Sequence, residues 1–112
     1  MKEIKAYVRP SRVEDVIHAL EETGIRGMTL INVSALCDWA DPQKALYSIE
    51  FVEKYSKTVK LELVCEDEEA MRLVEIIRKH AQTGSKGDGK IFVADIVEAI
   101  SIRTGATGSQ AL

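Results

Sequence analysis

The chain contains 112 residues with a formal net charge of −3 at pH 7; 46% of the residues are hydrophobic and 29% are charged. This length and composition are typical of one globular domain, which we expect to span residues 1–112. The acidic balance argues against a general nucleic-acid-binding protein, and no apolar run approaches the ~20 residues of a membrane-spanning helix. Because the N-terminus also lacks the apolar core of a signal peptide, we expect a cytoplasmic protein that does not insert into a membrane.

Four segments have the character of β-strands. Residues 2–8 and 57–65 alternate between apolar and polar side chains, which is typical of strands with one buried face. Residues 29–36 are β-branched and apolar, and residues 90–94 are also rich in strand-forming side chains. A fifth segment, residues 100–103, is expected to add a short strand.

Two segments repeat apolar residues at the spacing of an amphipathic helix. The apolar positions of the first are Val13, Val16, Ile17 and Leu20. Those of the second are Ala70, Leu73, Val74, Ile77 and Ala81. Ser11 with Glu14 predicts a capping box at the start of the first helix, and Gly24 predicts its end. Asp67 is expected to cap the second helix.

The predicted order of elements is β-α-β-β-α-β. This order favours an α+β, ferredoxin-like fold, with an antiparallel four-stranded sheet and two helices on one face. A long loop, about residues 37–54, separates the second and third strands. The sheet face without helices would stay bare in a monomer, so we expect the chain to associate.

The segment 83–93 joins the second helix to the fourth strand and contains three glycines and two lysines. Glycine allows successive backbone N–H groups to converge on one point, where they bind an anion. We interpret the segment as a phosphate-binding loop; a flexible loop of turn residues is the alternative. The letters from Gly84 to Lys90 also fit the start of a P-loop. We reject that reading because Ile91 replaces the magnesium-binding Ser or Thr, and because a P-loop joins a strand to a helix.

The same segment, Thr-Gly-x-x-Gly-Asp-Gly-Lys-Ile-Phe-Val, resembles the second signature of the PII signalling proteins, the trimeric nucleotide sensors of nitrogen and carbon metabolism. Further family motifs follow in the expected order: Arg9-Pro10, Gly24-Ile25-x-Gly27-Met28-Thr29, Val59-Lys60-Leu61-Glu62-Leu63-Val64 and Ile102-Arg103-Thr104-Gly105. The resemblance covers residues 1–112 without gaps. It implies a homotrimer, in which the three sheets line a central axis.

The resemblance also implies that ADP, AMP or ATP binds between subunits. The backbone of Gly87, Asp88 and Gly89 and the side chain of Lys90 would hold the phosphates, and Arg103 would reach them from the neighbouring subunit. The residues implied around the adenine are Gly27, Met28, Thr29, Glu62, Val64 and Thr83. Those implied beside the ribose and phosphates are Ala35, Leu36, Cys37 and Asp38. No cofactor acts as a catalyst, and the histidines and cysteines lack the spacing of a metal site.

Four positions at the implied ligand site depart from the family pattern. Asp38 and Ser101 stand where the family usually has arginines that contact the outer phosphates, a change of about three charge units. We therefore expect ADP or AMP to bind more tightly than ATP. Trp39 and Thr58 replace the glutamine and lysine that serve magnesium and 2-oxoglutarate, which predicts weak 2-oxoglutarate sensing. The alternatives are that Asp38 points to solvent, that the chain is a conventional ATP- and 2-oxoglutarate-responsive regulator, or that a small anion such as bicarbonate binds beside ADP.

The long loop corresponds to the family's T-loop, which docks on regulated proteins. Phe51 stands where uridylylated members carry a tyrosine, and Tyr47 matches a different family tyrosine. Trp39 is either an anchor of the loop or a contact for the partner. Cys37 is either an ordinary residue at the base of the loop or a redox-sensitive thiol. The partner itself, a membrane transporter or an enzyme, is not identified by the sequence.

The sequence favours a regulatory binding protein over an enzyme of phosphoryl transfer. An enzyme of that kind needs a nucleophile, a general base and a set of magnesium ligands at recognisable spacing. The chain shows no such set, so phosphoryl transfer remains the less favoured alternative.

Overall fold

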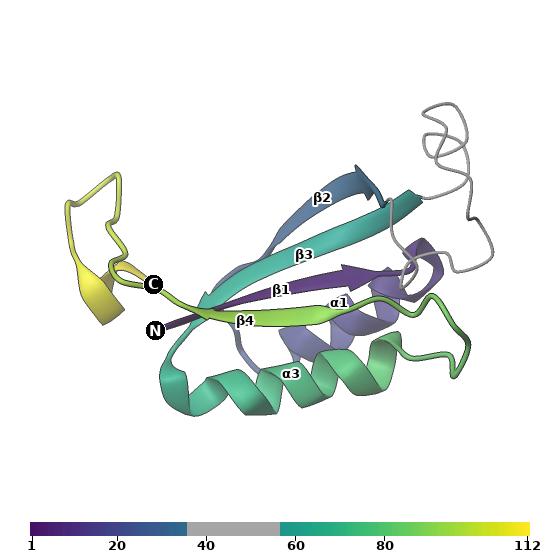
Figure 1. Cartoon of the computed structure of the whole chain (residues 1–112). Helices are drawn as coiled ribbons and strands as arrows, with labels where there is room; N and C mark the ends of the chain where they lie inside the picture. The colour runs from purple at the N-terminus through teal and green to yellow at the C-terminus, as the bar shows by residue number, and fades with distance from the viewer. Residues whose placement is uncertain (36–56) are drawn as a thin grey trace.

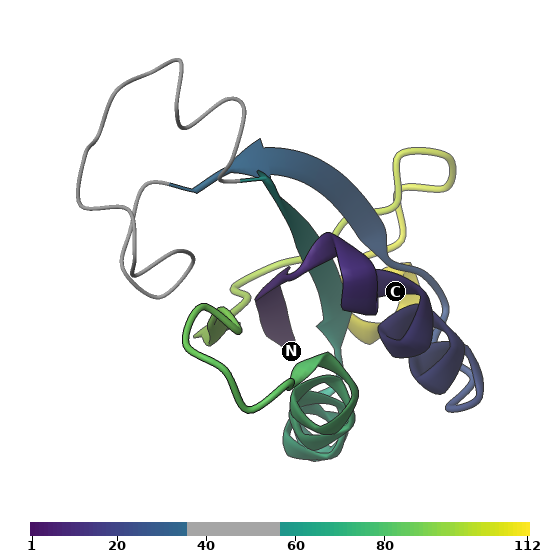
Figure 2. The ribbon, with the colours of Figure 1, turned by 90° about the vertical axis from the view of Figure 1, so that its right-hand side faces the viewer.

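The computed structural model describes residues 1–35 and 57–112. The strands are β1 (Lys2–Val8), β2 (Thr29–Ser34), β3 (Lys57–Cys65) and β4 (Ile91–Asp95). The helices are α1 (Val13–Glu21), α3 (Asp67–Ala81) and two short 3-10 helices, η1 (Pro10–Arg12) and η2 (Gly108–Ala111). The strands pair antiparallel in the order β2-β3-β1-β4, and α1 and α3 both lie on one face of the sheet (Figures 1 and 2). This confirms the predicted ferredoxin-like α+β fold.

The hydrophobic core lies between the sheet and the two helices. The registers of β1 against β3 place Ile4 opposite Leu63 and Ala6 opposite Leu61, so that alternate residues of both strands face the helices. Leu20 of α1 and Leu73 and Ile77 of α3 cover them and are fully buried. Burying an aliphatic side chain of this size stabilises a fold by about 1.5–3 kcal/mol. All of the apolar positions predicted for the second helix, and all but Ile17 of those predicted for the first, lie in the core or pack against it.

The starts of both helices differ from the prediction. Ser11 lies within η1 rather than at a helix cap, and no side chain caps α1. Pro10, whose ring fixes φ, begins the 3-10 turn in which the Arg12 N–H donates to the Arg9 carbonyl at 2.9 Å. Asp67 is the first residue of α3 rather than its cap, and its carboxylate pairs with the Met1 ammonium group at 2.8 Å.

The segment after β4 also differs from the prediction. Residues 100–103 do not form a strand: Ile100 makes a single bridge to Thr107, and the chain turns over residues 102–104. Gly105, with φ of +73°, donates its N–H to the Ser101 carbonyl at 2.8 Å and so closes the turn. The prediction of a short strand at residues 100–103 is therefore wrong. Two strand ends also differ from the predicted ranges: β4 begins at Ile91 rather than at Lys90, and β2 ends at Ser34 rather than at residue 36.

The sheet face opposite the helices is open in the single chain (Figure 2). Lys60 pairs with Glu62 at 2.6 Å and Lys5 with Glu3 at 3.0 Å along the strands of this face. The rings of Tyr7 and Phe92 meet edge to face, with their centroids 6.1 Å apart. Exposed apolar side chains continue beyond β4, at Val97, Ile100 and Ile102. Such a surface is typical of a face that a further subunit covers.

Candidate functional site

The segment 83–90 is organised around the carboxylate of Asp88. Its Oδ2 accepts hydrogen bonds from the backbone N–H groups of Thr83 at 2.8 Å and Gly84 at 3.0 Å. Its Oδ1 accepts from the Thr83 hydroxyl and from Arg9 Nε, the latter at 3.0 Å. The first N–H groups of the glycine-rich segment are thus occupied by the protein's own carboxylate. A bound phosphate must use the groups that follow.

The donors around Asp88 keep it ionised. Partial burial raises the pKa of this carboxyl, but the hydrogen bonds from Thr83, Arg9 and Gly84 outweigh that effect and lower the pKa from 3.8 to about 2. At neutral pH the negative charge that holds the loop together is therefore always present.

Within residues 1–35 and 57–112, the N–H groups of Gly87 and Gly89 donate to no acceptor, whereas the N–H of Asp88 closes a tight turn over Lys86 and Gly87 with a weak bond. Gly87 and Gly89 have φ of +95° and +98°, a left-handed conformation that L side chains rarely adopt. Gly89 also lies directly against β1, since a Cβ at this position would stand 1.9 Å from the Tyr7 carbonyl oxygen. The loop thus offers the N–H groups of Gly87 and Gly89 from a backbone fixed to the sheet, and glycines at positive φ are typical of an anion-binding nest.

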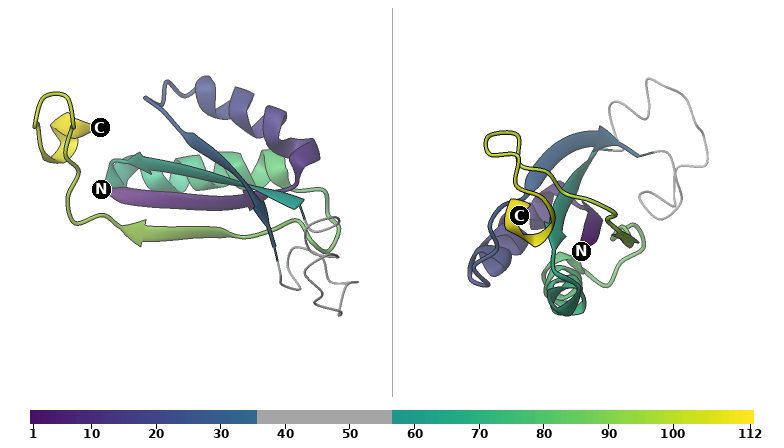
Figure 3. Two further views of the ribbon diagram at one scale, coloured as in Figure 1. Left: turned by 90° about the horizontal axis from the view of Figure 1, so that it is seen from above. Right: turned by 90° about the vertical axis from the view of Figure 1, so that its left-hand side faces the viewer.

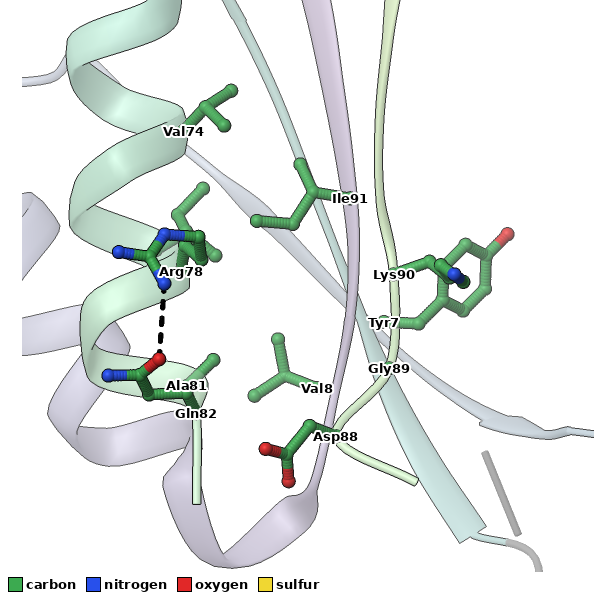
Figure 4. Close-up of a pocket in the computed structure, with 11 residues that line it drawn as sticks. Tyr7, Val8, Val74, Arg78, Ala81, Gln82, Asp88, Gly89, Lys90 and Ile91 are labelled. Carbon is green, nitrogen blue, oxygen red and sulfur yellow. Dashed lines mark hydrogen bonds between the residues drawn. The ribbon is translucent and has the colours of Figure 1, made fainter. Parts of the chain in front are cut away.

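Lys90 lies on the open face of the sheet, away from α3. In Figure 4 its side chain projects beside Tyr7, on the side opposite to Val74 and Arg78. A cavity of about 290 Å³ lies on the helix side. Its lining is mostly apolar and includes Val8 and Ile91, together with Arg78 of α3 and residues 88–90 of the loop. The ammonium group of Lys90 therefore adds its charge on the open face rather than in this cavity.

A second group of the predicted residues lies further along the sheet. Thr29 on β2 and Glu62 on β3 are register partners, and both belong to the open face. The hydrogen bond from Lys60 lowers the pKa of Glu62, which keeps this carboxyl ionised. Met28 packs on the edge of the core. Gly27 and Val64 line a cavity of about 420 Å³ near the end of β3.

Arg103 lies far from Lys90 within one chain. Lys90 lies beside the end of β1, where the Tyr7 N–H donates to the Lys90 carbonyl at 2.9 Å. Asp95, the last residue of β4, lies beside the start of β1 as the register partner of Lys2, and the chain reaches Arg103 only after it. Lys2 and Tyr7 stand about 16 Å apart along β1, at about 3.3 Å per residue. The turn with Arg103 and the loop with Lys90 thus lie at opposite ends of the sheet (Figure 3). One chain alone does not bring these two cations together.

Several predicted residues lie outside the described part of the chain. They are Leu36, Cys37, Asp38, Trp39, Tyr47 and Phe51, together with the loop 37–54. Ala35 is described and is buried directly after β2. Thr58 is also buried, so this position is neutral and enclosed in the single chain. Within residues 1–35 and 57–112, no three His, Cys, Asp or Glu side chains are grouped to hold a metal ion. In the same ranges, no helix is both long and apolar enough to cross a membrane.

Arg9 is the functional candidate that the motifs did not reveal as a site residue. The sequence indicated only that Arg9-Pro10 ends the first strand. In the structure its guanidinium reaches Asp88, 79 residues away along the chain. No local spacing signals a contact of that separation.

Comparisons with known proteins agree over nearly the whole chain. Residues 1–106 match the family model described as "Nitrogen regulatory protein P-II". Proteins with that name from Rhizobium meliloti and Rhodospirillum rubrum are 39% and 40% identical to the chain over 112 residues, and both alignments cover all of each protein. The crystal structure of Arabidopsis thaliana PII bound to citrate superposes with a TM-score of 0.80 at 32% identity, covering 99% of this chain and 91% of that one.

Proposed function

Because the chain belongs to the nitrogen regulatory protein P-II family, we propose that it is a homotrimeric signalling protein that binds an adenine nucleotide between subunits and regulates a partner protein. PII proteins are regulators rather than enzymes, form trimers and bind adenine nucleotides as effectors. The observation that carries the proposal is the loop 83–90, where the N–H groups of Gly87 and Gly89, without acceptors among the described residues, precede Lys90. The protein acts in the cytoplasm, on a partner that is a transporter or an enzyme.

The division of the site between subunits is supported by the separation of Lys90 and Arg103. Cations at opposite ends of one sheet can serve the same phosphates only if a second subunit brings its Arg103 to the first subunit's Lys90. The open sheet face and the exposed Ile100 and Ile102 supply apolar surface for that association. Both observations favour a site that is complete only in the oligomer.

The choice of nucleotide has two candidate answers. The names of the relatives favour a nitrogen regulator of the conventional kind, for which the family resemblance implies a response to ATP and 2-oxoglutarate. The described residues Ser101 and Thr58 favour the other, a regulator that prefers ADP or AMP. Ser101 has no charge to offer a γ-phosphate, and buried Thr58 has none to offer a carboxylate. Because these two positions lack a positive charge, the second candidate predicts tighter binding of ADP or AMP than of ATP, and no effect of 2-oxoglutarate.

Calorimetric titration of the purified trimer tests both levels of the proposal. ATP, ADP and AMP are each titrated with magnesium, with and without 2-oxoglutarate, against the wild type and Lys90→Ala. Nucleotide binding that Lys90→Ala weakens supports the proposed site, and absence of binding in the wild type overturns it. Tighter binding of ADP or AMP, with no effect of 2-oxoglutarate, supports the second candidate. Tight ATP binding that 2-oxoglutarate strengthens identifies the conventional regulator.

A further inference from the structure

Arg9, just after the end of β1, connects the sheet to the phosphate-binding loop. Its Nε donates to Asp88 Oδ1 at 3.0 Å, and its Nη2 donates to the Lys86 carbonyl at 2.7 Å. The other side-chain hydrogen bonds around Asp88 come from within the loop, from Thr83, so Arg9 ties the loop to the end of β1. We propose that Arg9 is the positioning residue of the loop, which sets the direction of its free N–H groups. This inference rests on the function proposed above.

The contact with Lys86 determines where the N–H of Gly87 points. A trans peptide unit carries its C=O and N–H groups on opposite sides. The Lys86 carbonyl is turned toward Arg9, so the Gly87 N–H of the same peptide unit is turned away from it. Gly87 permits this orientation through its φ of +95°. The hydrogen bond from Arg9 to the Lys86 carbonyl therefore sets the direction of the Gly87 N–H, on the opposite side of the same peptide unit.

The contact with Asp88 fixes the other end of the same short stretch. Arg9 and Asp88 are both half-buried, with side-chain exposures of 33% and 24%, so water screens this pair less than it would a fully exposed one. A guanidinium group holds its donors in a rigid planar fork, which suits two acceptors at a fixed separation. A lysine ammonium is a single point charge and cannot reproduce this fork. Arginine at position 9 thus locks residues 86–88 as a unit.

Arg12 offers a matched control in the same chain. Its Nε donates to the His80 carbonyl at 3.0 Å, and its guanidinium pairs with Asp15 at 3.2 Å. The side-chain exposure, 34%, is close to that of Arg9, and the partners are again one carbonyl and one carboxylate. These contacts join η1 to the end of α3 and to α1 rather than to the loop. Loss of Arg12 should therefore cost stability without altering the nest.

The test compares Arg9→Met, Arg9→Lys and Arg12→Met with the wild type. ADP affinity is measured by calorimetry, thermal unfolding by circular dichroism, and the amide resonances of Gly87 and Gly89 by NMR. Arg9→Met is expected to weaken ADP binding about tenfold or more, because the nest loses two charge-assisted hydrogen bonds. It should also shift both glycine amides. Arg9→Lys should recover only part of the affinity, and Arg12→Met should bind ADP within about twofold of the wild type at a similar loss of thermal stability.

The outcomes separate the two proposals. If the wild type does not bind ADP or any other adenine nucleotide, the proposed function and this inference both fall. If the wild type binds ADP and Arg9→Met binds it equally well, only the inference is overturned. It is also overturned if Arg12→Met loses as much affinity, since the effect would then follow from stability alone, or if Arg9→Lys restores full binding. Should Arg9→Met not fold, the intermediate affinity expected of Arg9→Lys decides the question.

Discussion

The carboxylate of Asp88 makes a pH-dependent contribution to stability. Its pKa in the folded protein, about 2, lies below the ordinary value of 3.8. The ionised form is therefore favoured by folding, and the contribution, about 2 kcal/mol, is fully present well above pH 4 and is lost as the pH falls toward 2. We expect Asp88→Asn to lose this amount at pH 7. Urea unfolding of both proteins between pH 7 and pH 2 measures it.

The difference between wild type and Asp88→Asn isolates this group from the other carboxyls. Glu62 and Glu75 also have lowered pKa values, from hydrogen bonds with Lys60 and Arg78, and they titrate in both proteins. The gap between the two stability curves should shrink as the pH falls from 4 to 2. A gap that stays constant over this range would show that Asp88 does not stabilise the loop through its charge.

Gly89 is the residue whose replacement the backbone tolerates least. A Cβ here would lie 1.9 Å from the Tyr7 carbonyl oxygen, at a φ of +98°. Gly89→Ala combines this clash with left-handed strain, and we expect it to lower the free energy of unfolding by about 3 kcal/mol or more and to abolish nucleotide binding. Gly84→Ala is the control: its φ is +85°, but nothing lies within 4 Å of the added atom.

Chemical denaturation and calorimetry measure both glycine variants. Gly84→Ala should lose about 1–2 kcal/mol from strain alone. Equal losses in the two variants would mean that the close approach of Gly89 to β1 relaxes at no cost.

The roles of these residues were predictable only in part. The glycine and lysine pattern predicted a phosphate-binding loop and its position after the second helix. It did not reveal that the Asp88 carboxylate occupies the N–H groups of Thr83 and Gly84, nor that Arg9 reaches this carboxylate. The contact of Arg9 spans 79 residues and exists only once the sheet has formed. The directions of the backbone N–H groups in a turn likewise depend on φ and ψ, which a sequence indicates but does not determine.

At the scale of the elements, α3 is held by its buried stripe rather than by caps. No side chain caps its first turn, and Leu73 and Ile77 are fully buried against the sheet. Leu73→Ala should lower the free energy of unfolding by about 2–5 kcal/mol, through lost burial and a residual cavity. Met71, two residues away and 69% exposed, is the control, and Met71→Ala should change stability by less than about 0.5 kcal/mol. Comparable losses in urea unfolding would contradict this account of α3.

The elements were predicted well where one physical signal dominated. β1 and β3 match their predicted ranges, because strict alternation fixes which face of a central strand is buried. The helix starts were wrong, because Ser11 and Asp67 have the chemistry of caps but not the backbone position; Pro10 had already begun a 3-10 turn. The extra strand at 100–103 was wrong because Gly105 reverses the chain, and local strand preference cannot outweigh a turn with φ of +73°.

At the scale of the whole molecule, the separation of Lys90 from Arg103 makes a quantitative prediction. Lys90→Ala and Arg103→Ala should each abolish ADP binding. In mixed trimers, a site is intact only where a subunit with Lys90 meets a neighbour with Arg103. Equal amounts of the two variants, unfolded and refolded together, give about three-quarters mixed trimers with one intact site in three, so about a quarter of all sites recover.

This recovery distinguishes a shared site from one built within a single chain. If one subunit supplied both cations, every chain in the mixture would carry a defect and no site would recover, whatever the oligomeric state. Calorimetric stoichiometry measures the recovered fraction, and sedimentation confirms that the mixture contains trimers. Each variant refolded alone is the control and should bind no ADP. Recovery near a quarter would assign the two cations to different subunits, and recovery near zero would return Arg103 to a role outside the nucleotide site.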